Sequence, residues 1–105
     1  MINVVLFCAA GMSTSMLIKK MEDAAKAKGV EVKVSAYPEA QLAKYVPTAD
    51  VVLIGPQIRY ALKKITAVCE QYNIPVEVIS PQDYGLMNGA KVLEQAERLA
   101  ASRTK

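Results

Sequence analysis

The strongest constraint on the fold is an alternation of short apolar runs with segments of helical periodicity. Residues 2–7 and 51–54 are almost entirely apolar and rich in β-branched side chains, which predicts two buried strands. In residues 30–36 valines alternate with charged residues, which predicts a strand with one solvent-exposed face. Residues 76–79 predict a fourth strand. Apolar residues at helical spacing predict helices over residues 13–28, over residues 40–46, from Ile58 onward and from about Asn88 onward. In the helix that begins at Ile58, one face is predicted to carry Leu62, Ile65, Cys69 and Tyr72.

Strands that alternate with helices at this spacing predict right-handed βαβ units, hence an α/β fold with a three-layer, doubly wound parallel sheet. The two most apolar strands should lie at the centre, which gives the flavodoxin-like order 2-1-3-4. Such sheets bind ligands beyond the carboxyl ends of their strands, where the winding direction reverses. The segments expected there are the loop that begins at Cys8, the turn Gly55-Pro56-Gln57 and a loop over residues 80–85.

Composition narrows the functional classes. A chain of 105 residues predicts one domain, 1–105, and its net charge of +3 is too scattered for a nucleic-acid-binding surface. The longest apolar run is far shorter than a membrane span, and no basic segment precedes the first one, so a cytoplasmic protein without membrane insertion is expected. The chain has no histidine, and its two cysteines fit no zinc spacing, so no metal or other cofactor is predicted.

The segment from Cys8 to Ser15 joins the first strand to the first helix and contains no charged residue. Small residues let its backbone curl, and backbone amides closed by a helix N-terminus bind anions. A positive environment of that kind also favours a thiolate, the nucleophilic form of cysteine. Cys8 is therefore predicted to be a nucleophile beside a phosphate site. The predicted phosphate-binding residues are Ala9, Ala10, Gly11, Met12, Ser13, Thr14 and Ser15. One alternative stays open, in which Cys8 merely ends its strand and the hydroxyl residues merely cap the helix.

Tyrosine phosphatases have a related pattern, in which an arginine stands six residues after the cysteine. That position holds Thr14, so no guanidinium can clamp the phosphoryl oxygens. The loop also lacks a group that could activate water, so a phosphocysteine here would hydrolyse slowly, as a phosphoryl carrier requires. A low-molecular-weight phosphatase or arsenate-reductase-like enzyme remains the alternative, with Asp83 as a candidate general acid. A thiol redox protein would need Cys69, which is predicted to be buried, as its resolving cysteine.

The segment from Leu6 to Leu17 resembles the phosphorylation loop of the lactose/cellobiose family of enzyme IIB in the bacterial phosphotransferase system. The sequence Met-Ser-Thr-Ser at residues 12–15 is similar to the corresponding sequence in the cellobiose/chitobiose branch of that family. The resemblance extends over essentially the whole chain, through residues 37–39, 49–58 and 75–79 and then Tyr84-Gly85.

The resemblance implies a phosphoryl relay. Cys8 would accept a phosphoryl group from a phosphohistidine of enzyme IIA and pass it to a β-linked disaccharide bound by the membrane permease, enzyme IIC. Residues 9–15 would supply the phosphate-binding donors. Gln57 and Tyr84 could surround the site, although Gln57 could equally only begin its helix and Tyr84 only pack its loop. Arg59 could assist docking or simply be solvated. Neither the sugar nor the oligomeric state follows from the sequence.

Overall fold

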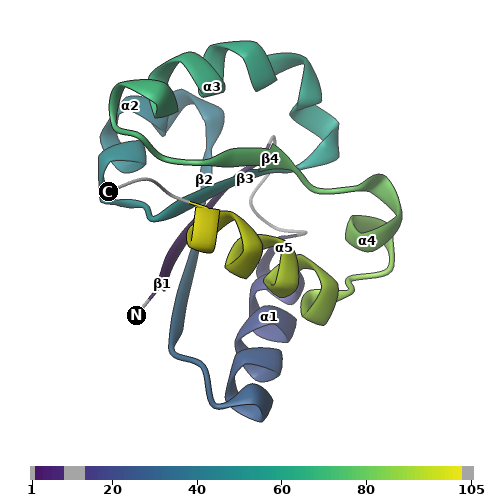
Figure 1. The fold of residues 1–105 in the computed structure, drawn as a ribbon. Coiled ribbons are helices and arrows are strands. Elements are labelled where there is room, and N and C mark those ends of the chain that lie inside the picture. The colour runs from purple at the N-terminus through teal and green to yellow at the C-terminus, as the bar shows by residue number, and fades with distance from the viewer. Residues whose placement is uncertain (1, 9–13, 103–105) are drawn as a thin grey trace.

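The structure, a computed structural model, describes residues 2–8 and 14–102, and a parallel four-stranded sheet forms the centre of this part of the chain. The strand order is β2-β1-β3-β4, which confirms the predicted α/β fold and its order 2-1-3-4. All neighbouring strands are parallel (Figure 1). The strands are β1 (Ile2–Cys8), β2 (Val32–Pro38), β3 (Val51–Ile54) and β4 (Val76–Val78).

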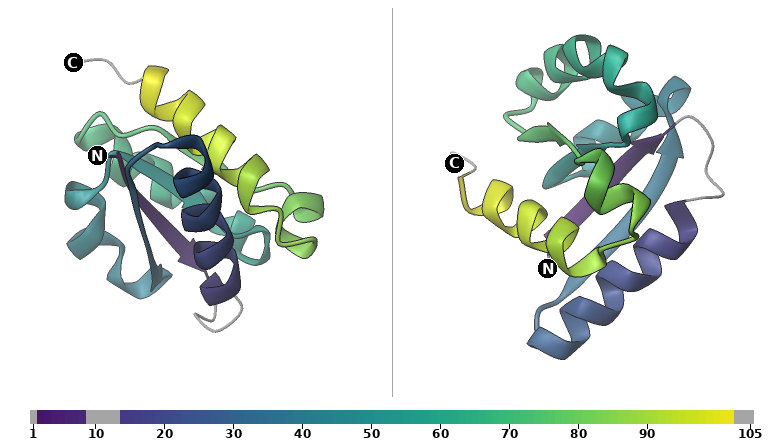
Figure 2. Two further views of the ribbon diagram at one scale, coloured as in Figure 1. Left: turned by 90° about the horizontal axis from the view of Figure 1, so that it is seen from below. Right: turned by 90° about the vertical axis from the view of Figure 1, so that its right-hand side faces the viewer.

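Helices cover both faces of the sheet, as the alternating pattern predicts (Figures 1 and 2). One face carries α1 (Thr14–Lys28) and α5 (Gly89–Ser102), which lie side by side. The short helix α4 (Pro81–Gly85) joins β4 to α5. The other face carries η1 (Glu39–Gln41), α2 (Leu42–Tyr45), η2 (Val46–Thr48), η3 (Pro56–Ala61) and α3 (Leu62–Gln71). Within the described residues, no helix is both long and apolar enough to span a bilayer.

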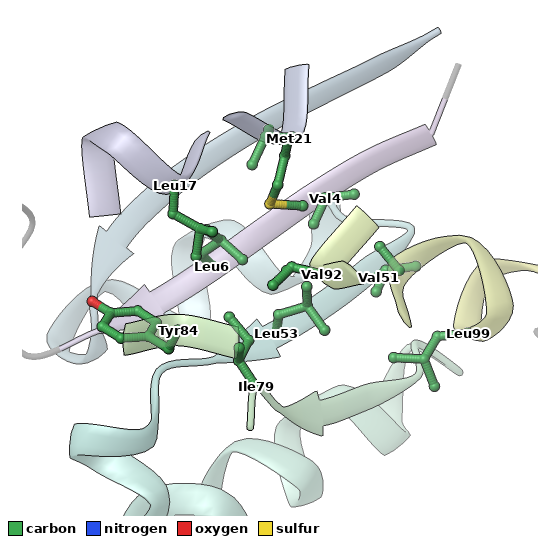
Figure 3. Packing of buried hydrophobic residues seen from close by; sticks show 12 residues of the cluster. Val4, Leu6, Leu17, Met21, Val51, Leu53, Ile79, Tyr84, Val92 and Leu99 are labelled. Carbon is green, nitrogen blue, oxygen red and sulfur yellow. The ribbon is translucent and has the colours of Figure 1, made fainter. Parts of the chain in front are cut away.

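Two hydrophobic cores lie on opposite faces of the sheet because successive strand residues point to opposite sides. In β1, Val4 and Leu6 belong to the core under α1 and α5, whereas Val5 and Phe7 belong to the core under α2 and α3. Figure 3 shows the first of these cores. All four residues of β3 are buried, which explains why that strand reads as continuously apolar.

Three details differ from the sequence predictions. Strand β2 begins at Val32 and ends at Pro38, two residues later than predicted at each end. Residues 81–85 form α4 where a loop was expected, because the Ser80 hydroxyl caps it by accepting from the Asp83 amide at 3.1 Å.

The third difference concerns the face that α3 buries. Leu62 and Tyr72, which were predicted to share a face with Ile65 and Cys69, are 37% and 44% exposed. Tyr72 follows Gln71, the last residue of α3, and its dihedral angles of −114° and 7° leave the helix, so it no longer shares the buried face. Leu62 is the first residue of α3 and follows the irregular 3₁₀ segment η3, and at this junction the buried residue is Ala61.

Candidate active site at the carboxyl edge of the sheet

Cys8 is the last residue of β1 and lies at the edge of the sheet where all the strands end. It pairs with Pro38 of β2 on one side. On the other side the chain leaving β3 reaches Gly55, whose N–H donates to the carbonyl oxygen of Phe7 at 2.9 Å. The Cys8 side chain is only 1% exposed. Bulk water therefore has little access to this sulfur.

Gly55 lies close to Cys8. A Cβ atom built on Gly55 would lie 3.6 Å from the Cβ of Cys8, which is an ordinary contact distance. The same Cβ would lie only 2.7 Å from Oε1 of Gln57. The Gln57 amide oxygen and the Cβ of Cys8 therefore both lie next to the empty Cβ position of Gly55. The structure thus brings together two residues that are 49 positions apart in the sequence.

The first helix contributes its N-terminus to the same edge. Figure 2 shows α1 beginning beside the ends of β1 and β2. None of the residues in the first turn of α1 is acidic, whereas its last turn contains Lys26 and Lys28. The partial positive charge of the helix N-terminus is therefore not neutralised by a carboxylate of that turn. Such an end favours an anion held close to Cys8.

Most of the predicted phosphate-binding loop lies outside the described residues. This applies to Ala9, Ala10, Gly11, Met12 and Ser13, and to the side chain of Thr14. Ser15 lies in the first turn of α1 and is exposed. The phosphate-binding role of residues 9–15 stays a prediction.

Tyr84 and Asp83 both lie in α4, one element beyond the end of β4. The ring of Tyr84 is 7% exposed and belongs to the core that contains Leu6 and Leu17 (Figure 3). This position gives Tyr84 a packing role, and its contribution to the site stays a prediction. Asp83 lies in the first turn of α4, where a carboxylate interacts favourably with the helix dipole. That placement provides a structural reason for an acidic residue at position 83.

Cys69 lies on α3, within the core of the opposite face, and is fully buried. Burial raises the pKa of its thiol from 9.0 to about 11, so the thiol stays neutral at physiological pH. A neutral thiol is a poor nucleophile, which argues against Cys69 as a resolving cysteine. Among residues 2–8 and 14–102, no three His, Cys, Asp or Glu side chains gather as a metal site would require.

The contact between Gly55 and Gln57 is the feature of this site that the sequence did not disclose. The Gly-Pro-Gln sequence directly after an apolar strand indicates a turn near the site, and Gln57 was a candidate on that ground. Arg59, two residues further on, is exposed in η3. The steric dependence of Gln57 on a glycine at position 55 becomes visible only when the atoms are placed.

Residues 3–95 match the family model described as the lactose/cellobiose-specific IIB subunit of the PTS system. The chain is 40% identical to the galactose-specific EIIB component of Lactococcus lactis subsp. cremoris, over 91% of this chain and 94% of that protein. It is 38% identical to the oligo-beta-mannoside-specific EIIB component of Bacillus subtilis, over 96% and 98% of the two chains. The solution structure of the cellobiose-specific phosphotransferase IIB component from Borrelia burgdorferi superimposes with a TM-score of 0.82 at 39% identity, covering 99% of this chain and 95% of that one.

Proposed function

This chain belongs to the lactose/cellobiose-specific IIB family of the sugar phosphotransferase system, and from that premise we propose that it carries a phosphoryl group on Cys8. The observation that carries the proposal is the position of Cys8. Cys8 is the last residue of β1, at the carboxyl edge of the sheet. It lies beside the N-terminus of α1, and no residue in the first turn of that helix is acidic. That position combines a nucleophile with an anion-stabilising helix end.

The relay consists of two balanced transfers. In the first, the thiolate sulfur of Cys8 attacks the phosphorus of a phosphohistidine on enzyme IIA. The S–P bond forms while the N–P bond breaks, and the bonding electron pair stays on the imidazole nitrogen. In the second, a sugar hydroxyl oxygen attacks the same phosphorus, the S–P bond breaks, and the hydroxyl proton is released. The Cys8 thiolate is then restored, so the chain needs no cofactor.

The proposed acceptor is a β-linked disaccharide of the cellobiose/chitobiose class, bound by the membrane component, enzyme IIC. Relatives of this chain are named for galactose, oligo-beta-mannoside and cellobiose, at identities of 40%, 38% and 39%. This chain is nearly equally similar to three relatives that are named for different sugars. Its overall sequence identity to them therefore does not identify its sugar. The carrier itself works in the cytoplasm and meets the membrane only through enzyme IIC.

Intact-mass spectrometry tests the phosphocysteine. The protein is incubated with phosphoenolpyruvate, the general phosphotransfer proteins and a matching enzyme IIA. The wild type should gain the mass of one phosphoryl group, and fragmentation should place it on Cys8. Cys8→Ser should gain none under the same conditions. Cys69→Ala is the matched control and should be phosphorylated like the wild type, because Cys69 lies on α3 in the hydrophobic core between that helix and the sheet.

The phosphatase alternative gives the opposite result. A phosphatase would hydrolyse an aryl phosphate without any partner protein, and it would lose that activity on substitution of Cys8. Failure of the wild type to gain a phosphoryl group from several competent enzyme IIA donors, together with such hydrolysis, would refute the carrier function.

A further inference from the structure

We propose that the side-chain amide of Gln57 hydrogen-bonds the phosphoryl group on Cys8, and that residue 55 is glycine because only glycine leaves room for that amide. This inference rests on the proposed phosphocysteine. It adds a phosphoryl-binding residue from the chain that follows β3, separate from the loop that follows β1.

The first step of the argument concerns space. The φ and ψ angles of Gly55 are −63° and 143°, which any residue adopts, so its backbone conformation does not require glycine. A Cβ at position 55 would meet Phe7 and Cys8 at ordinary distances of 3.6 Å. Among the described residues, its one severe contact would be with Oε1 of Gln57 at 2.7 Å. Alanine at position 55 would therefore displace the Gln57 side chain and leave Phe7 and Cys8 in place.

The second step concerns position. Gly55 is held against β1 by its hydrogen bond to the Phe7 carbonyl, one residue before the nucleophile. The Gln57 amide and the Cβ of Cys8 both lie next to the same point in space, the empty Cβ position of Gly55. Gln57 is otherwise exposed, so its side chain is not held there by burial in a core. An anion added to the Cys8 sulfur would enter the surroundings of this amide.

The third step concerns chemistry. A half-turn of the amide exchanges Oε1 and Nε2, and in crystallographic practice the two are assigned from the hydrogen bonds they make. An anionic phosphoryl group would select the orientation in which Nε2–H donates to it. An amide has no basic group that could take a proton from water. Gln57 can therefore stabilise the phosphoryl group during transfer without promoting its hydrolysis, as a carrier requires.

The experiment compares four variants with the wild type: Gln57→Ala, Gly55→Ala, the double variant and Gln57→Glu. The readout is the rate of Cys8 phosphorylation by limiting phosphorylated enzyme IIA, followed by quenched-flow intact mass. Gln57→Ala should slow the transfer by about tenfold to a hundredfold, the worth of one hydrogen bond to a charged group. Gly55→Ala should slow it comparably, and the double variant no further than either single variant. Gln57→Glu should be slower than Gln57→Ala because its carboxylate repels the phosphoryl oxygens.

Two matched controls exclude general effects of the substitutions. Gly85→Ala adds a methyl group where, apart from its chain neighbours and its own helix backbone, no atom of the described residues lies within 4 Å. Gln71→Ala removes an exposed amide at the far end of α3. Both should transfer at the wild-type rate. Melting curves of all variants should coincide with the wild type, because Gln57 is exposed and the backbone angles at position 55 suit alanine.

The outcomes separate this inference from the function beneath it. Wild-type rates in Gln57→Ala and Gly55→Ala, with Cys8 still phosphorylated, would overturn the inference and leave the carrier function standing. Losses that multiply in the double variant would overturn the steric link between Gly55 and Gln57. Absence of phosphorylation in the wild type would overturn the carrier function and this inference together.

Discussion

Gly89→Ala should be among the most damaging single-methyl additions to this protein. Gly89 is the first residue of α5 and lies against the backbone of α1. A Cβ there would fall 2.4 Å from the carbonyl carbon of Lys20 and 2.6 Å from the amide nitrogen of Met21. Backbone atoms inside a helix cannot rotate away as a side chain can. The two helices must therefore separate where they cross.

The size of the effect follows from these distances. Ordinary contacts begin near 3.4 Å, so α5 must move about 1 Å away from α1. A gap of that size weakens the contacts between Met21 of α1 and Val92 of α5 in the core they share. Overpacking typically costs about 1–3 kcal/mol, and alanine at the first helical position recovers only part of its usual advantage over glycine. A net loss of about 2 kcal/mol should lower the melting temperature by about 8–16 °C.

Urea and thermal denaturation followed by far-UV circular dichroism would measure this loss. Gly85→Ala is the control, because outside its own helix a methyl group there meets no atom of residues 2–8 and 14–102 within 4 Å. Its unfolding free energy should stay within about 0.5 kcal/mol of the wild type. A Gly89→Ala protein that melts at or above the wild-type temperature would refute the reasoning. In that case the crossing of α1 and α5 would tolerate the extra volume.

Two further predictions concern α3. Burial raises the pKa of Cys69 from 9.0 to about 11, so its stabilising contribution is complete below about pH 9 and is lost as the pH rises through about 11. The wild type should therefore lose about 2–3 kcal/mol more unfolding free energy than Cys69→Ala across that interval, and parallel urea-derived curves would contradict this. Ile65→Ala should cost about 2–5 kcal/mol, whereas Leu62→Ala should cost well under about 1 kcal/mol because Leu62 is 37% exposed. Equal losses in the two variants would show that the phase of α3 is misplaced.

The sheet was predictable because hydrophobic patterning reports directly on burial. β3 lies between β1 and β4 and is buried on both faces, so its four residues are all apolar. β2 lies at an edge, so its residues alternate and its limits are harder to read. The short helix α4 was missed because five residues are too few to show a helical period. Its start signals, a serine cap followed by proline, are visible in hindsight at Ser80 and Pro81.

Helix α3 shows why periodicity fails next to an irregular segment. The apolar spacing from Ile58 through Leu62 to Ile65 fits one continuous α-helix. Residues 56–61 instead form 3₁₀ turns, which advance by three residues per turn rather than 3.6. Ile58, Ile65 and Cys69 are buried as the spacing predicts, but at the junction of the two segments Ala61 lies in the core and Leu62 does not. An alanine and a leucine in succession gave no sequence signal strong enough to reveal this.

The position of Cys8 in the candidate site follows from the order of elements along the chain. The position of Gly55 beside it depends on the register between β1 and β3. Cys8 could be placed from sequence because it ends the first apolar run of a doubly wound sheet. Gly55 reads as an ordinary turn residue, and the extended angles before Pro56 are those any residue prefers before proline. Its special requirement arises because Phe7 pairs with Ile54, which brings the next residue of each strand into contact. A glycine with unrestricted backbone angles therefore indicates a need for space, and here that space lies between the amide oxygen of Gln57 and the Cβ of Cys8.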